Sequence, residues 1–341
     1  IFAGRGDKAI SGGDGNDTLI VEPAYGVANL TETIVLDGGS GKDLMIGAQG
    51  NETFIVDDPG DVVVDLGGTD RIASSVSFEL PDGVEHLDLQ GLDAIDGMGN
   101  DSANQLRGNG AANRLFGEGG ADTLIGGDGS DTYGVDDAGD QVIESNAVTA
   151  SGGSDLVLSV LAAYTLPDNV ENGRIVAGGA ANLTGNHLDN LLDAGVGDNL
   201  IAGDAGSDTL SWAHGVIGAG GVSASLVTGI ASGGSGNDRF TGIEHLIGST
   251  DDDRLTGDGN VNRLSGGLGN DTLDGGGGAD TLTGGDGNDF YYVDHAGDVV
   301  SETNATAAGG IDLVFTTVAS YTLGAHVENA RILATGAANL T

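Results

Sequence analysis

Residues 248–292 read GSTDDDRLT GDGNVNRLS GGLGNDTLD GGGGADTLT GGDGNDFYY, five consecutive copies of one nonapeptide phrase. The phrase approximates Gly-Gly-x-Gly-x-Asp-x-apolar-x. Its sixth position is Asp253, Asn262, Asp271, Asp280 and Asp289. Its eighth position is Leu255, Leu264, Leu273, Leu282 and Tyr291. Each copy can therefore place one apolar side chain in a core and one carboxylate or amide at a fixed offset. A period this short predicts a solenoid, in which each repeat packs against its neighbours.

Further copies of the phrase begin at Gly12, Gly38, Gly126 and Gly233. Together these copies resemble the glycine-rich and aspartate-rich repeats of the bacterial RTX family. The resemblance implies an all-β fold, a right-handed parallel β-roll or β-solenoid stabilised by calcium. In that family two nonapeptides make one turn of the roll, so every second loop stacks on the same edge.

The composition fits a solenoid better than a compact globule. Among 341 residues there are 65 glycines but only one Trp, six Tyr and seven Phe, which supply a narrow core. The net charge of −41 argues against nucleic acid and anionic membrane surfaces as partners, and makes cations the natural ones. No apolar run approaches about 18 residues, so no membrane insertion is expected. Cysteine is absent, which excludes disulfides and thiolate metal sites.

A longer period is superimposed on the nonapeptides. Phe54 and Tyr133 begin similar phrases, and the interval between them fits twice between Tyr133 and Tyr291. The sequence thus predicts a module as long as the interval from Phe54 to Tyr133, with one degenerate copy before Tyr291. The predicted parts are a truncated first β-roll (1–55), a module with longer-turn strands followed by β-roll (56–134) and a second module (135–212). A degenerate module that ends in the densest array (213–292) and a truncated last module (293–341) follow.

Other segments continue the solenoid or mark its limits. Val222–Val227 alternates apolar and polar residues and predicts a strand. No helix of useful length is expected, because glycine interrupts every window of about nine residues. The sequence of 332–341 repeats much of 175–184, so we expect the chain to be a segment of a longer tandem array.

The repeat chemistry suits calcium. This hard cation takes six to eight oxygens at about 2.3 to 2.6 Å, chiefly from carboxylates and backbone carbonyls. The resemblance implies that each ion lies between two stacked loops and is held by position-six side chains. The implied metal ligands are Asp17, Asp43, Asn104, Asp122, Asp131, Asp208, Asp238, Asp253, Asn262, Asp271, Asp280 and Asp289. The implied stacked pairs are Asp253–Asp271, Asp271–Asp289, Asn262–Asp280, Asn104–Asp122, Asn113–Asp131 and Asn190–Asp208.

Position six departs from the family pattern at Lys8, Glu52, Asn113 and Asn199. Lysine should abolish its half-site and asparagine should lower its charge, so calcium occupancy is expected to be uneven and densest between residues 248 and 292. We also expect the repeat aspartates to lie along a water-exposed edge.

The acidic turns after each module landmark allow two interpretations. They are further calcium ligands, or they are solvated turns capped by aspartate. The groups concerned are Asp57 and Asp58 with Asp61, Asp136 and Asp137 with Asp140, and Asp294 with Asp298.

The sequence favours a calcium-binding structural segment of a secreted, bacterial cell-surface protein, such as a stalk, S-layer, adhesin or filament. The resemblance to the RTX family implies that it is exported unfolded by type I secretion and folds on calcium outside the cell. Calcium ions are the expected partners, with self-association or tandem copies of the module as further ones. The alternative is the C-terminal secretion and folding region of an RTX enzyme or toxin, such as a protease, lipase or epimerase. We expect no enzymatic activity in this segment, since its acids lie on repeat positions. Two other functions are disfavoured. An EF-hand calcium site would need two helices, which the sequence does not predict. An ice-binding solenoid would need unbroken rows of threonine, and arginines interrupt the threonines at position seven.

Overall fold

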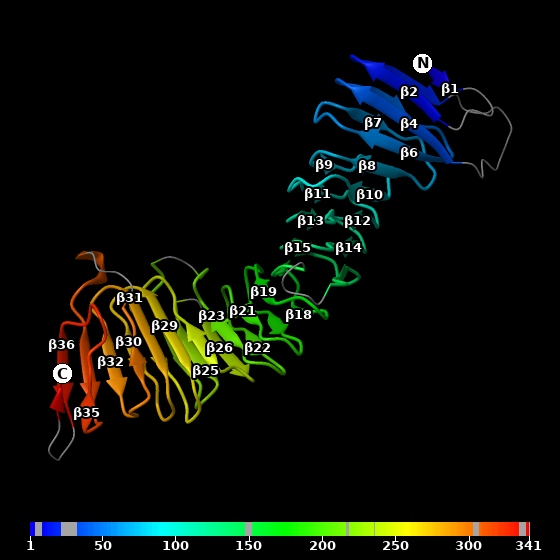
Figure 1. Cartoon of the computed structure of the whole chain (residues 1–341). Coiled ribbons are helices and arrows are strands. Elements are labelled where there is room, and N and C mark those ends of the chain that lie inside the picture. The colour runs from blue at the N-terminus through cyan, green and yellow to red at the C-terminus, as the bar shows by residue number, and fades with distance from the viewer. Residues whose placement is uncertain are drawn as a thin grey trace. The chain divides into compact units, whose positions relative to one another are not determined.

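The structure is a computed structural model that describes residues 1–3, 9–21, 33–146, 152–215, 218–234, 236–302, 307–333 and 339–340. The chain divides into two compact units, 1–158 with 167–170 and 159–166 with 171–341. Each unit is a stack of short, mainly parallel strands (Figure 1). The described residues contain one helical element, the 3-10 helix η1 (Ala307–Gly309). The predicted all-β solenoid is therefore confirmed, whereas its handedness stays a prediction.

The strands of the first unit form three sheets. One sheet has the order β1 (Phe2–Ala3), β3 (Thr18–Val21), β5 (Leu44–Ile46) and β7 (Val62–Val64). The second has the order β2 (Ala9–Asp14), β4 (Thr33–Ser40), β6 (Asn51–Val56), β8 (Arg71–Ser74), β10 (His86–Leu89), β12 (Gln105–Arg107), β14 (Thr123–Ile125) and β16 (Gln141–Ile143). The third contains β9 (Phe78–Glu79), β11 (Gly97–Met98), β13 (Arg114–Phe116) and β15 (Thr132–Val135). The chain leaves this unit within β17 (Leu156–Ser159).

The second unit has two long faces and a short edge pair. One face has the order β19 (Asn172–Ile175), β21 (Leu191–Asp193), β23 (Thr209–Ser211), β27 (His245–Ile247), β29 (Arg263–Leu268), β31 (Thr281–Asp286) and β33 (Val299–Val300). The other has the order β18 (Ala163–Thr165), β20 (Asn182–Thr184), β22 (Leu200–Ala202), β26 (Gly236–Thr241), β25 (Ile230–Gly233), β24 (Val222–Ser225), β28 (Arg254–Thr256), β30 (Thr272–Asp274), β32 (Phe290–Val293), β34 (Leu313–Thr316) and β36 (Asn329–Ile332). The edge pair is β35 (Ser320–Tyr321) and β37 (Asn339–Leu340).

Successive nonapeptides alternate between the two faces. Leu255 on β28 is in register with Leu273 on β30, and Leu264 on β29 is in register with Leu282 on β31. In both pairs the partner lies two nonapeptides further along the chain, so two nonapeptides make one turn, as the resemblance implied. This register stacks equivalent loops directly on one another.

The core is narrow, because each nonapeptide contributes one large apolar side chain to it from one of the two faces. Leu255, Leu264, Leu273 and Leu282 are each at most 1% exposed and point inward from their strands. Neighbouring strand residues face outward, because side chains alternate along a strand. The eighth repeat position therefore fills the core, as predicted, and the loops between strands lie at its rim.

The degenerate module departs from the purely parallel arrangement. β24 pairs with β25 in the antiparallel direction, and β25 pairs with β26 likewise. The β24–β25 turn uses Gly229, whose φ of 63° favours glycine, and its N–H donates to Ser225 O at 2.9 Å. On the other face β23 pairs directly with β27. The strand predicted from 222–227 is thus present as β24, with its neighbour reversed.

Candidate metal sites along the repeat loops

The position-six side chains form a ladder from turn to turn. The N–H of Asp253 donates to Asp271 Oδ1 at 2.7 Å, and the N–H of Asp271 donates to Asp289 Oδ1 at 2.7 Å. The N–H of Asn262 donates to Asp280 Oδ1 at 2.8 Å. Each hydrogen bond spans two nonapeptides, so the predicted stacking of these pairs is confirmed.

The same ladder joins the other predicted pairs. Bonds of 2.7 to 2.8 Å link Asn104 to Asp122, Asn113 to Asp131 and Asn190 to Asp208. The backbone N–H of Asp17 donates to Asp43 Oδ1 at 2.6 Å, although this step along the chain is longer than two nonapeptides. The ladder therefore tolerates insertions between its steps.

The repeat carboxylates are buried, which corrects the expectation of a water-exposed edge. Asp271, Asp280 and Asp289 have no exposed surface. The cause is the first glycine of each loop, which lies directly against the carboxylate at position six. A Cβ on Gly266 would come within 2.0 Å of Asp271 Oδ2. Glycine at position one is thus needed for close approach of the backbone to the carboxylate.

One oxygen of many ladder carboxylates accepts no hydrogen bond from any residue that the structure describes. Oδ1 is occupied by the N–H of the previous turn, while Oδ2 is buried and faces the loop. Among the predicted ligands, the residues with such an Oδ2 are Asp43, Asp122, Asp131, Asp208, Asp271, Asp280 and Asp289. A buried anionic oxygen without a donor is costly unless a cation approaches it. These oxygens and the adjacent loops therefore fit a hard cation.

Burial makes these carboxylates poor acids. Burial raises the pKa of Asp271 to about 8, and repulsion by Asp253, Asp289 and Asp252 adds to the rise. Burial also raises the pKa to about 6 in Asp122, Asp131, Asp208, Asp280 and Asp289. A bound dication would reverse this effect, because an opposite charge favours the ionised form. Burial thus disfavours the ionised form of the ladder carboxylates, beyond what their backbone donors offset, and a positive partner would restore it.

The asparagines at position six satisfy their own loops. Asn262 Oδ1 accepts the N–H of Asp258 at 2.8 Å, and its Nδ2 donates to Glu244 O at 2.9 Å. Asn104 makes the corresponding bonds to Asn100 at 2.7 Å and Val84 at 3.3 Å. The amide N–H supplies the donor that an aspartate lacks. These two predicted ligands therefore need a cation less than their aspartate neighbours do.

Three of the predicted aspartates differ from the seven described above. Asp238 Oδ1 accepts the N–H of Asn199 at 2.8 Å, and its Oδ2 accepts the indole N–H of Trp212 at 2.7 Å. Both oxygens of Asp253 likewise have partners, among them Ser249 and Val222. Asp17 is only half-buried. Their roles as ligands stay predictions.

The departures at position six have different outcomes. Glu52 is buried and its N–H continues the ladder to Asp70 Oδ1 at 2.6 Å, so its longer side chain keeps a carboxylate inside. Asn199 Nδ2 donates to Ala194 O at 2.7 Å and to Gly197 O at 3.0 Å. Lys8 lies outside the described residues.

The acidic turns after the landmarks are capped turns. Asp61 Oδ2 accepts the N–H groups of Asp57 at 3.2 Å and Asp58 at 3.3 Å, while its Oδ1 continues the ladder from Asp43 at 2.9 Å. Asp140 and Asp298 repeat the arrangement in the later modules. Of the two interpretations, these contacts support aspartate-capped turns.

A comparison with known families agrees with this geometry. The family described as RTX calcium-binding nonapeptide repeat (4 copies) matches residues 1–21, 35–57, 98–133, 177–211, 240–273 and 256–291. The chain belongs to the RTX calcium-binding repeat family. No curated protein matches it. The RTX repeats identify the chain as a calcium-binding β-roll domain, and their position-six residues are the ladder described above.

Other carboxylates join the RTX ladder without being predicted. The N–H of Asp70 donates to Glu85 Oε2 at 2.8 Å, that of Asp208 to Glu244 Oε2 at 2.8 Å and that of Asp312 to Glu328 Oε2 at 3.0 Å. These glutamates each follow Val or Ile in a longer-turn stretch. That recurring Val/Ile-Glu pair is the sequence signal that could have found them.

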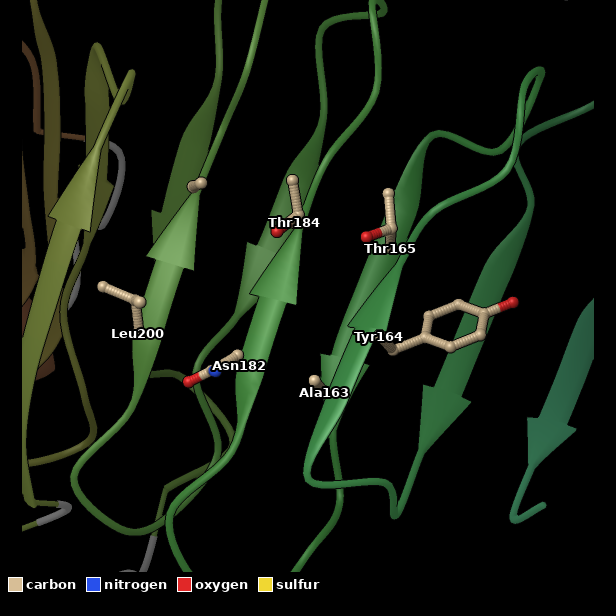
Figure 2. A pocket seen from close by; sticks show the side chains of 7 residues that line it. Ala163, Tyr164, Thr165, Asn182, Thr184 and Leu200 are labelled. Carbon is tan, nitrogen blue, oxygen red and sulfur yellow. The ribbon is translucent and has the colours of Figure 1, made fainter. Parts of the chain in front are cut away.

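A surface pocket in the second unit does not compete with the RTX loops as a metal site. Its volume is about 280 Å³, and β18, β20 and β22 carry its lining (Figure 2). The lining residues are Ala163, Tyr164, Thr165, Asn182, Thr184, Leu200 and Ala202. They include no carboxylate or histidine. Among the described residues no helix is long and apolar enough to cross a membrane.

Proposed function

We propose that this β-roll is a structural segment of a secreted, cell-surface protein and that calcium drives its folding after export. The observation that carries the proposal is the set of seven predicted ligands with a buried Oδ2 that accepts no hydrogen bond from a described residue. Calcium between stacked loops would supply their partner, and its binding free energy would become folding free energy. The segment is then a structural element whose cohesion depends on an ion that is abundant outside cells.

The narrow core supports a need for metal. Each nonapeptide buries one large apolar side chain, while ordering its whole backbone costs conformational entropy. Without a cation, ladder carboxylates repel one another and the net charge of −41 favours an expanded chain. The proposal gives the segment no catalytic role, because its perturbed acids belong to a repeated ladder. Tandem copies of the module would add further turns of β-roll, and self-association would join separate chains.

A calcium titration followed by circular dichroism tests the proposal. In chelator the chain should lack most of its β signal, and calcium should restore it cooperatively. Magnesium at the same concentration is the control and should restore little, because it demands smaller, more regular coordination. A full β signal in chelator would contradict calcium-driven folding.

The structural role needs its own test. The full reading frame should contain many further copies of the module that spans 56–134. A compact catalytic domain joined to this segment would instead favour a secretion and folding region of an RTX enzyme or toxin.

A further inference from the structure

Three carboxylate clusters lie beside the loop ladder, two of them where a nonapeptide array meets a longer turn. In each cluster one oxygen from every member lies within 4.8 Å of the others. The clusters are Glu52–Asp65–Asp70, Asp131–Glu144–Asp155 and Asp289–Glu302–Asp312. Two belong wholly to the first unit and one to the second. We call them the junction clusters.

The junction clusters recur with the module. Glu52 and Asp131 are separated by the same interval as Phe54 and Tyr133, and so are Asp65 and Glu144. Asp289 and Glu302 follow Asp131 and Glu144 after twice that interval. A chance cluster in an acidic chain would not keep these positions. The arrangement is therefore part of the module, beyond the nonapeptide itself.

The cluster around Asp289 gathers oxygens at one point. Asp289 Oδ2 and Tyr291 Oη are buried, and neither has a hydrogen-bond partner among the described residues. A Cβ on Gly284 would lie 2.0 Å from Tyr291 Oη and 2.1 Å from Asp289 Oδ2, so both atoms face the same space. Glu302 is fixed beside it by the N–H groups of Gly284 at 3.2 Å and Gly285 at 3.3 Å.

The longer turn creates this space. Asp289 donates its N–H to Asp312 Oδ1 at 2.8 Å across a longer stretch of chain than the two nonapeptides of a regular turn. The added residues include Glu302, which follows β33 and brings a third carboxylate to the ladder. Asp131 and Asp155 are joined at 2.7 Å across a similarly lengthened turn.

The first cluster carries the clearest sign of a missing positive partner. Glu52 Oε1, Asp65 Oδ1 and Asp70 Oδ2 are all buried and accept no hydrogen bond from described residues. Glu52 and Asp70 are 1% and 0% exposed. Each of the three carboxylates has a backbone N–H on its other oxygen, so the three oxygens without a donor lie together within 4.8 Å. Such a group is costly without a positive partner.

We propose that each junction cluster is a second class of calcium site, occurring once in each regular module and distinct from the sites between paired nonapeptide loops. The donors are all hard oxygens, which calcium prefers as ligands, and in each cluster they lie within 4.8 Å of one another. The proposal rests on the proposed function, because Asp131 and Asp289 also belong to the loop ladder. Asp238, which lies in the degenerate module, has no oxygen left without a donor, because its Oδ2 accepts the indole N–H of Trp212 at 2.7 Å.

The test counts bound ions in the full chain. Glu144→Gln together with Glu302→Gln keeps the side-chain shape and removes two junction charges outside the nonapeptide loops. Native mass spectrometry at limiting calcium should show two tightly bound ions fewer than in wild type, with the remaining ions unchanged. The matched control is Glu79→Gln, which removes an exposed carboxylate and should not change the count.

A second variant reports on the site if the glutamine variant folds poorly. Terbium should replace calcium, and Tyr291 should sensitise its emission because Oη faces the cluster. Tyr291→Phe should reduce that emission to what Tyr133 contributes beside Glu144 of the second cluster, while keeping the calcium count, since Phe54 stands at the equivalent position of the first cluster. An unchanged calcium count in the double variant, or unchanged tyrosine-excited emission in Tyr291→Phe, would overturn the junction sites alone. Wild-type protein that takes up no calcium would overturn the proposed function with them.

Discussion

The N–H of Asp271 donates a 2.7 Å hydrogen bond to Oδ1 of Asp289, one full turn further along the roll. This bond fixes the carboxylate of Asp289 and turns its Oδ2 toward the loop, where no described residue donates to it. Backbone folding and ligand placement are therefore one event. This arrangement needs the negative charge of the carboxylates, the space beside the first glycine of each loop, and the apolar core.

Asp271→Asn should weaken calcium-driven folding. The change keeps the side-chain shape but removes one charge contact with the cation, worth about 1 to 4 kcal/mol. The calcium concentration at the folding midpoint should rise by about tenfold, as followed by circular dichroism. Asp101→Asn removes an exposed charge and should leave the midpoint within error. Equal midpoints in the two variants would exclude Asp271 as a ligand.

Gly266→Ala should impair calcium binding more than a typical glycine substitution. The added methyl group would meet Asp271 Oδ2 at 2.0 Å and displace the carboxylate. Gly259→Ala is the matched control, because its Cβ would meet no atom within 4 Å. Calorimetric titration should show fewer or weaker sites in Gly266→Ala only. Identical isotherms would show that close contact with Gly266 is unimportant.

Without metal, residual structure should increase as the pH falls. Burial raises the pKa of Asp271 to about 8 and that of Asp280 to about 6, above their values in the unfolded chain. The folded state then binds more protons than the unfolded state, so stability is present below about pH 4 and lost as the pH rises through 6 to 8. Circular dichroism in chelator across this range checks the direction.

Calcium should show the opposite pH dependence. Protons compete with the ion for the same carboxylates, so calcium affinity should fall as the pH drops from 8 to 6. Calcium titrations at several pH values measure this shift. An affinity independent of pH over this range would contradict binding by the buried ladder.

Leu273→Ala should destabilise the calcium-loaded roll by about 2 to 5 kcal/mol, because it opens a cavity in a core that receives only one large side chain from each nonapeptide. Leu268→Ala is the control, since that side chain is half exposed. Urea unfolding at saturating calcium measures the difference. Similar losses in both variants would mean that the eighth repeat position is not the core.

The regular part of the roll could be predicted from sequence because its period fixes its register. With two nonapeptides per turn, Leu255 must face Leu273 and Asp271 must stack beneath Asp289. Burial of Asp271 could not be predicted in the same way. It depends on how closely Gly266 approaches the carboxylate, which a repeat pattern does not specify.

The irregular parts follow from chain segments that lack the nonapeptide period. Glu302 reaches Asp289 because a longer turn replaces one of two nonapeptides. No local sequence pattern predicts that contact. The reversed strand β25 depends on the tight turn at Gly229. Both features arise from insertions, whose paths are set by tertiary packing more than by local propensity.

Because each N–H of one turn orients the carboxylate of the next, an ordered turn acts as a template for its neighbour. Growth of the roll would then resemble closure of a zipper, in which the first step is slow and every later step is assisted. A chain that emerges into a calcium-rich medium end first would be drawn forward as each turn locks, with little tendency to slip back.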